Sequence, residues 1–304
     1  MATSTGKIDF HYQGATYQTW YKLVGNVRST KAGVRPLIAL HGGPGVSHSY
    51  MTPHADLLAS HGIPVVLYDQ IGVGQSSHRK DAPKEFWTVE LFMDELESLL
   101  NHFGISGDYD LIGHSWGGML AGNFAAARHP AGLKHLIITN TLASMALWEE
   151  STAGLVKQLP QNLQDIIRKH EKDGTTDAPE YQEAMMVFYK QHVCRLEPWP
   201  QDLTVSFAAM EEDPTVYHTM LGPSEFTITG TLKTWTIVDK LPTIKCPTLM
   251  MNSVFDEAQD VCVLPFFKYI PQVKWVQFAN SSHVPFFEER ERYMKVVGNF
   301  LTKV

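Results

Sequence analysis

The sequence predicts an α/β fold in which a doubly wound, mostly parallel sheet carries an inserted cap of helices. Short apolar runs closed by a polar residue or a glycine alternate with stretches whose apolar residues recur at helical spacing. This alternation stops between residues 142 and 240, where the pattern is mostly helical, and then resumes. An insertion of that length is rarely an unstructured loop. We therefore expect 1–141 and 241–304 to form one core domain and 142–240 to form a cap.

The predicted elements follow from local patterns, taken in chain order. Residues 8–25 alternate and are rich in Tyr, Phe, Thr and Val, which predicts an antiparallel hairpin. The next runs, at 37–40, 65–68, 109–112 and 136–139, are short and mostly apolar, as is typical of parallel strands buried on both faces. Strands are predicted at 37–40, 65–68, 109–112, 136–139, 247–251 and 273–278. Helices are predicted at 86–103, 117–128, within 159–174, within 178–193, and from about 288 to 301.

Composition excludes several classes of partner. A net charge of −7 disfavours nucleic acid and anionic membranes as main partners. The first residues lack the apolar core of a signal peptide, and no run approaches the ~20 apolar residues of a membrane span. Cys194, Cys246 and Cys262 are widely spaced, as expected for free thiols in a reducing compartment. We therefore expect a cytoplasmic monomer that binds no metal and no cofactor.

Ser115 is the candidate nucleophile. Residues 113–117, Gly-His-Ser-Trp-Gly, fit G-x-S-x-G and lie between a predicted strand and a predicted helix. That context is typical of the nucleophile elbow of the α/β-hydrolase fold, where the glycines permit a sharp turn that projects the hydroxyl. The motif predicts a serine hydrolase.

A serine hydroxyl needs a base within hydrogen-bond reach and a carboxylate that orients the base. In this architecture both follow the serine, on loops after the last strands. His283 is the only histidine after the final predicted strand. Two aspartates follow the preceding strand, Asp256 and Asp260, and Asp256 is favoured because it comes first.

The tetrahedral intermediate of such a reaction needs two N–H donors. One is expected from the backbone of Trp116, directly after the nucleophile, and the other from Gly43, in the turn His-Gly-Gly-Pro-Gly at 41–45. A glycine-rich turn can also cradle a phosphate, but no Lys-Ser/Thr follows as a P-loop requires. Trp116, Trp199 and Trp235 are candidates to line the pocket, and ordinary packing in the core or the cap is the alternative for each.

Several motifs occur in order along nearly the whole chain. They are HGGPG at 41–45, YDQIGVGQS at 68–76, GHSWGG at 113–118, GPSEFTITG at 222–230 and SSHVPFFEE at 281–289. Together they resemble the proline iminopeptidases within the α/β-hydrolases, and most closely the branch that includes the tricorn-associated aminopeptidase. The resemblance implies that Asp256 is the acid of the triad. It also implies that Glu225 and Glu257 hold the free α-amino group of a substrate.

Two carboxylates near a covered site would bind one ammonium group and reject substrates that lack it. The predicted enzyme releases an N-terminal proline or small apolar residue from short peptides or aminoacyl amides or esters, through an acyl-enzyme. The family motif Gly-x-Tyr/Phe-Asp-Glu lacks its glycine here, because Ser253 stands in that place, and this departure leaves the substrate open. One alternative is an esterase or amidase that acts on a small metabolite without a free amine, and another is a non-catalytic binding protein on the same scaffold.

Overall fold

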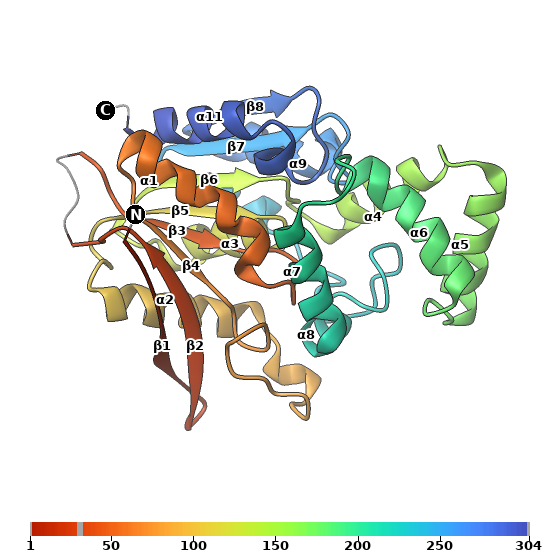
Figure 1. Cartoon of the computed structure of the whole chain (residues 1–304), viewed down its shortest axis with the longest axis horizontal. Coiled ribbons are helices and arrows are strands. Elements are labelled where there is room, and N and C mark those ends of the chain that lie inside the picture. Colours follow the sequence, from red (N-terminus) through yellow and green to blue (C-terminus); the bar gives the residue numbers. More distant parts are fainter. Residues whose placement is uncertain (1, 29–32, 303–304) are drawn as a thin grey trace.

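The computed structural model describes residues 2–28 and 33–302, and the strands of this part form one eight-stranded sheet (Figure 1). The strand order is β1-β2-β4-β3-β5-β6-β7-β8. The strands are β1 (Thr3–Tyr12), β2 (Ala15–Val24), β3 (Leu37–Leu40), β4 (Val65–Tyr68), β5 (Tyr109–His114), β6 (Leu133–Thr139), β7 (Thr248–Ser253) and β8 (Val273–Phe278). The α/β prediction is confirmed.

The direction of each strand agrees with its sequence pattern. The alternating segments β1 and β2 form an antiparallel hairpin, and β2 pairs antiparallel with β4. From β4 to β8 all neighbours are parallel. The predicted hairpin is therefore confirmed, although it begins at Thr3 and not at residue 8.

The core lies on both faces of this sheet. In β3, Ile38 and Leu40 pack into one apolar cluster, whereas Leu37 and Ala39 pack into another. Successive side chains of a strand point to opposite faces, so an apolar run without alternation indicates a strand that is covered on both sides. The first cluster contains the apolar faces of α2 (Val89–Phe103) and α3 (Trp116–Arg128), and the second contains those of α1 (Asp56–His61) and α11 (Arg290–Thr302).

Two predicted helix boundaries are wrong by a few residues. The helix predicted at 86–103 begins at Val89, because the Thr88 side chain accepts a hydrogen bond from Leu91 N and caps it, while Phe86 lies in a separate 3₁₀ turn. The last predicted helix, from about 288 to 301, corresponds to α11, which begins at Arg290, and a separate short helix, α10 (Pro285–Glu288), precedes it. Between the two, Glu289 has a φ of −125° and a ψ of 46°, and its side chain binds Asn280 N and Ser281 Oγ.

Five helices occupy the interval between β6 and β7, where we predicted the cap. Figure 1 shows them beyond the carboxyl ends of the parallel strands. Part of this group has an apolar cluster of its own, which includes Ile167, Tyr181 and Phe188. The five are α4 (Met145–Val156), α5 (Gln161–Asp173), α6 (Pro179–His192), α7 (Gln201–Glu212) and α8 (Thr215–Met220).

The remaining elements complete the chain. They are the helix α9 (Asp260–Tyr269) and the 3₁₀ segments His48–Ala55, Lys84–Phe86 and Val238–Thr243. Within 2–28 and 33–302, no helix is both long enough and apolar enough to cross a bilayer. The three cysteines are free, with Cys194 and Cys262 buried and Cys246 half-buried.

Candidate active site

Ser115 lies in a sharp turn between β5 and α3. Its φ of 56° and ψ of −125° place a non-glycine residue in a strained backbone region. The flanking glycines allow this turn because a Cβ on Gly113 would lie 2.0 Å from Gly117 O, and one on Gly117 would lie 2.2 Å from Leu40 O. The backbone packing that exposes Ser115 therefore requires glycine on both sides.

His283 and Asp256 come together although 27 residues separate them. Asp256 follows β7 and His283 follows β8, and His283 Nδ1 lies 2.7 Å from Asp256 Oδ1. The carboxylate is fully buried, and it also accepts hydrogen bonds from Ala258 N at 3.0 Å and Asn140 Nδ2 at 2.7 Å. Since a carboxylate accepts, Nδ1 carries the proton and the neutral ring keeps a lone pair on Nε2.

Asp260, the other aspartate after this strand, has different partners. Its Oδ1 accepts hydrogen bonds from Asn252 Nδ2 and Gln277 Nε2, both at 2.7 Å. Asp260 is the first residue of α9, so its side chain binds β7 and β8 and is not the one bonded to His283. Of the two aspartates, the structure brings only Asp256 to the histidine.

The turn after β3 places Gly43 beside the nucleophile. Gly43 has a φ of +110°, and a Cβ there would lie 2.5 Å from Gly45 N, so only glycine fits. Gly43, Ser115 and Trp116 line one cavity. Among the described residues, neither Gly43 N nor Trp116 N has a hydrogen-bond acceptor. Two free amides therefore lie at the edge of the cavity that holds the serine.

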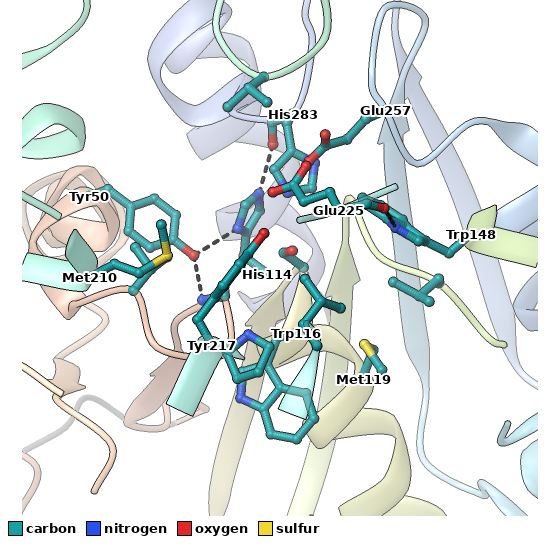
Figure 2. Close-up of a pocket in the computed structure, with 18 of the residues that line it drawn as sticks. Tyr50, His114, Trp116, Met119, Trp148, Met210, Tyr217, Glu225, Glu257 and His283 are labelled. Carbon is teal, nitrogen blue, oxygen red and sulfur yellow. Dashed lines mark hydrogen bonds and ion pairs between the residues drawn. The ribbon is translucent and has the colours of Figure 1, made fainter. Parts of the chain in front are cut away.

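A series of hydrogen bonds links the loop of His283 to Tyr50 through His114, the residue before Ser115 (Figure 2). His114 Nε2 donates to His283 O at 2.7 Å, so a neutral His114 accepts at Nδ1 from the hydroxyl of Tyr50 at 2.8 Å. Tyr50 in turn accepts from Gly42 N at 2.6 Å. Burial, aided by the nearby His283, lowers the pKa of His114 well below its ordinary value. These hydrogen bonds between uncharged groups join the loop of His283 to the turn that carries Gly43.

Glu225 and Glu257 lie beside His283 in the same cavity (Figure 2). The loop after α8 carries Glu225, whose carbonyl accepts a hydrogen bond from Trp148 Nε1 at 2.9 Å, and Ser151 Oγ donates to the carbonyl of Glu257. Among the described residues neither Oε2 atom has a hydrogen-bond partner. Burial raises the pKa of both carboxyls, and the charge of Glu225 raises that of Glu257 further. Two buried carboxyls without a cation can bind one positive group.

The rest of the cavity wall is mostly apolar and comes largely from the helices between β6 and β7. Trp148 lines the cavity and Trp116 does as well, whereas Trp199 and Trp235 pack elsewhere. Other lining side chains are Leu142, Met145, Leu203, Phe207, Met210 and Leu232. Within 2–28 and 33–302 no group of three or more His, Cys, Asp or Glu side chains could hold a metal ion.

Sequence reasoning missed several polar or aromatic residues of this site, among them Tyr50, His114, Asn140 and Trp148. Only Asn140 carried a usable signal, because it directly follows β6 at the same edge of the sheet as the other site residues. The roles of Tyr50, His114 and Trp148 depend on partners that are distant along the chain.

Comparisons with known proteins agree with this geometry. Residues 35–290 match the family model of the alpha/beta hydrolase fold. The chain is 38% identical to a proline iminopeptidase of Thermoplasma volcanium over 267 residues, and this match covers 88% of each chain. It is 34% identical over 287 residues to one of Clostridium botulinum, covering 94% of this chain and 95% of the relative.

Solved structures agree as well. The crystal structure of a proline iminopeptidase from Mycobacterium smegmatis has a TM-score of 0.89 and 40% identity, and covers 97% of both chains. That of VinJ has a TM-score of 0.92 and 45% identity, and covers 97% of this chain and 98% of VinJ.

Proposed function

The chain belongs to the proline iminopeptidase family of α/β-hydrolases and is a serine hydrolase, and we propose that it removes an amino-terminal residue from short peptides or aminoacyl amides. The residue removed is proline or a small apolar one. The buried pair of Glu225 and Glu257, in one cavity with Ser115 and His283, is the observation that carries this proposal.

The reaction begins with attack of Ser115 Oγ on the carbonyl carbon of the substrate, while His283 Nε2 takes the hydroxyl proton. Asp256 keeps the ring in the required tautomer and stabilises the imidazolium that forms. The negative charge on the carbonyl oxygen is bound by Gly43 N–H and Trp116 N–H. Such donors accelerate the step because they are already oriented before the charge develops.

In the second half, the intermediate collapses, the C–N bond breaks, and the leaving amine takes the proton from His283. An ester now joins the acyl group to Ser115. Water attacks this ester while His283 takes a proton from the water. His283 then returns that proton to Ser115 Oγ as the amino acid is released. Every step uses groups that line or adjoin the cavity.

The substrate's free ammonium group is bound between Glu225 and Glu257. Each carboxyl has an oxygen without a partner among the described residues, and an ammonium donates up to three hydrogen bonds. A substrate without this charge leaves both carboxyls buried and unpaired, which opposes its binding. This disfavours the alternative of an esterase or amidase for metabolites without a free amine.

The segment 142–240 acts as the cap that excludes water and long chains from the cavity. Its helices supply Met145, Trp148, Leu203, Phe207 and Met210 to the wall. We propose further that the enzyme acts as a cytoplasmic monomer, without metal or cofactor.

A panel of aminoacyl amides and esters, each with a free and an acetylated amine, tests the function. The proposal expects kcat/KM to be at least about tenfold higher for the free amines, a difference of ~1.4 kcal/mol. Ser115→Ala is expected to lose roughly 10⁴-fold or more in kcat, and with it labelling by a fluorophosphonate. Higher turnover of the acetylated substrates would instead support the alternative.

A further inference from the structure

Gln70 joins the two segments that carry the proposed oxyanion donors. It follows β4, and its backbone N–H donates to His41 Nε2 at 3.0 Å, while its side-chain Nε2 donates to His41 O at 3.2 Å. Its Oε1 accepts from Trp116 Nε1 at 2.9 Å. Gln70, His41 and Trp116 are all buried. One side chain therefore holds both the end of β3 and the start of α3.

The direction of these hydrogen bonds is determined by chemistry. A backbone N–H can only donate, so His41 accepts at Nε2 and a neutral His41 carries its proton on Nδ1. That Nδ1–H donates to Gly42 O at 3.1 Å. Burial lowers the pKa of His41 to about 4, which keeps the ring neutral at physiological pH.

The Gly42 carbonyl in turn orients the Gly43 amide. These two groups belong to one trans peptide plane, in which the C=O and the N–H point in opposite directions. His41 holds the carbonyl, and Tyr50 holds Gly42 N on the other side of the residue. The Gly43 N–H, which has no acceptor among the described residues, is thereby oriented from two sides.

We propose that Gln70 is a positioning residue of the oxyanion hole: through His41 it sets the direction of Gly43 N–H, and through the indole of Trp116 it holds the second donor in register. This inference rests on the proposed function, because it takes Gly43 and Trp116 as the donors. Gln70 does not line the cavity, so it acts on the reaction only through these two segments.

The main test replaces Gln70 by methionine, which has a similar volume and cannot make the two side-chain hydrogen bonds to His41 O and Trp116 Nε1. The hydrogen bond from the backbone N–H of residue 70 to His41 Nε2 is kept in this variant. Misplacing a donor removes more stabilisation from the transition state than from the bound substrate. We therefore expect kcat to fall roughly 10- to 100-fold while KM changes less than about threefold. An aminoacyl aldehyde, which forms a tetrahedral adduct with Ser115, reports the same loss directly. Its Ki should rise in parallel with the fall in kcat/KM.

Ser76→Ala is the matched control, because Ser76 lies in the same segment after β4. Ser76 Oγ accepts from Trp20 N at 2.8 Å and donates to Asp69 O, and its side chain binds neither His41 nor Trp116. This variant should lower the thermal midpoint and keep kcat and the aldehyde Ki near wild-type values. A loss of kcat equal to that of Gln70→Met would overturn the proposal, since general loosening of the segment would then explain both.

Gln70→Glu keeps the test open if the methionine variant fails to fold. It retains an acceptor for Trp116 Nε1 but places a carboxylate oxygen against His41 O, where two acceptors repel. It should also lower kcat with little change in KM. Wild-type kcat and aldehyde affinity in either Gln70 variant would overturn the proposal. Wild-type enzyme without activity on any aminoacyl amide would overturn the proposed function instead.

Discussion

His283 Nε2 lies 3.7 Å from Glu257 Oε1, while Nδ1 of the same ring lies 2.7 Å from Asp256 Oδ1. The imidazole is therefore placed between two carboxyls with different surroundings. Asp256 is hydrogen-bonded on both oxygens, whereas Glu257 keeps an oxygen without a partner among the described residues. The group that we propose to bind the substrate ammonium thus also faces the nitrogen that we propose to take the proton.

This relationship separates the effects expected for two isosteric variants. Glu225→Gln and Glu257→Gln each remove one charge–ammonium interaction, so kcat/KM for free-amine substrates should fall roughly 10- to 100-fold, as for a lost charged hydrogen bond of about 1.5–3 kcal/mol. With an acetylated ester, Glu225→Gln should have little effect. Glu257→Gln should still lower kcat at a pH above the raised pKa of Glu257, where the nearby charge helps to stabilise the imidazolium.

Steady-state kinetics on the paired free and acetylated substrates measure both effects. Ser115 labelling by a fluorophosphonate checks that each variant retains an accessible nucleophile. If both variants keep wild-type kcat/KM on free amines, the ammonium pocket is wrong.

Binding of a free amine should release protons. Burial raises the pKa of Glu225 and Glu257 in the free enzyme, and a bound ammonium lowers both again because it favours the charged carboxylates. Between the bound and free pKa values the complex therefore holds fewer protons than the free enzyme. Affinity should rise with pH across that window, until the α-amine itself deprotonates near pH ~7.7–8.0.

Calorimetry of Ser115→Ala with a free aminoacyl amide, in two buffers of different ionisation enthalpy, measures this release. The acetylated amide is the control and should show no buffer dependence. Proton uptake with the free amine would contradict the predicted coupling.

Asp256→Asn should reduce kcat roughly 10³- to 10⁴-fold, because an amide that donates to Nδ1 favours the wrong tautomer of His283. Asp260→Asn is the matched comparison, four residues along, and keeps an oxygen that can accept from Asn252 and Gln277. It should stay within about threefold of wild type, as is usual for a substitution away from the reacting groups. Equal losses in the two variants would contradict the assignment of Asp256.

Glu95 should make the fold lose stability as the pH rises from about 4.5 to about 8. It is fully buried, its Oε1 accepts from Thr19 Oγ1 at 2.5 Å and from Ile71 N at 3.0 Å, and burial raises its pKa to about 8. The ordinary value is 4.5, so between these values the folded chain holds a proton that the unfolded chain has lost. The stabilising contribution is complete below about pH 4.5. It then falls by roughly 1.4 kcal/mol per pH unit until about pH 8.

Glu95→Gln keeps an acceptor for Thr19 and Ile71 and does not titrate. Urea unfolding at pH 5.5 and pH 7.5 should show that the loss of stability between them is smaller in this variant than in wild type. Identical pH slopes would show that Glu95 is charged in the folded protein at both values.

The fold was largely predictable because its signals are local. The strands at 37–40 and 65–68 have the predicted bounds, since an apolar run buried on both faces has the same sequence pattern wherever it occurs. The edge strand at 273–278 also has its predicted bounds, although its Lys274 and Gln277 are exposed. Helix ends were less certain. The start of α2 depends on a threonine cap, and the break before α11 depends on contacts of Glu289 with residues of a different loop.

The sequence alone determined the class of chemistry, because the elbow around Ser115 combines a short motif with a strand before it and a helix after it. It left Asp256 and Asp260 as alternatives, and it offered no reason to notice Tyr50, His114 or Gln70. Those assignments depend on which side chains meet across 27 to 169 residues of chain. Only the tertiary structure decides that. The register of the parallel strands and the paths of their loops, and not local periodicity, bring the carboxyl ends of β3, β5, β6, β7 and β8 around one cavity.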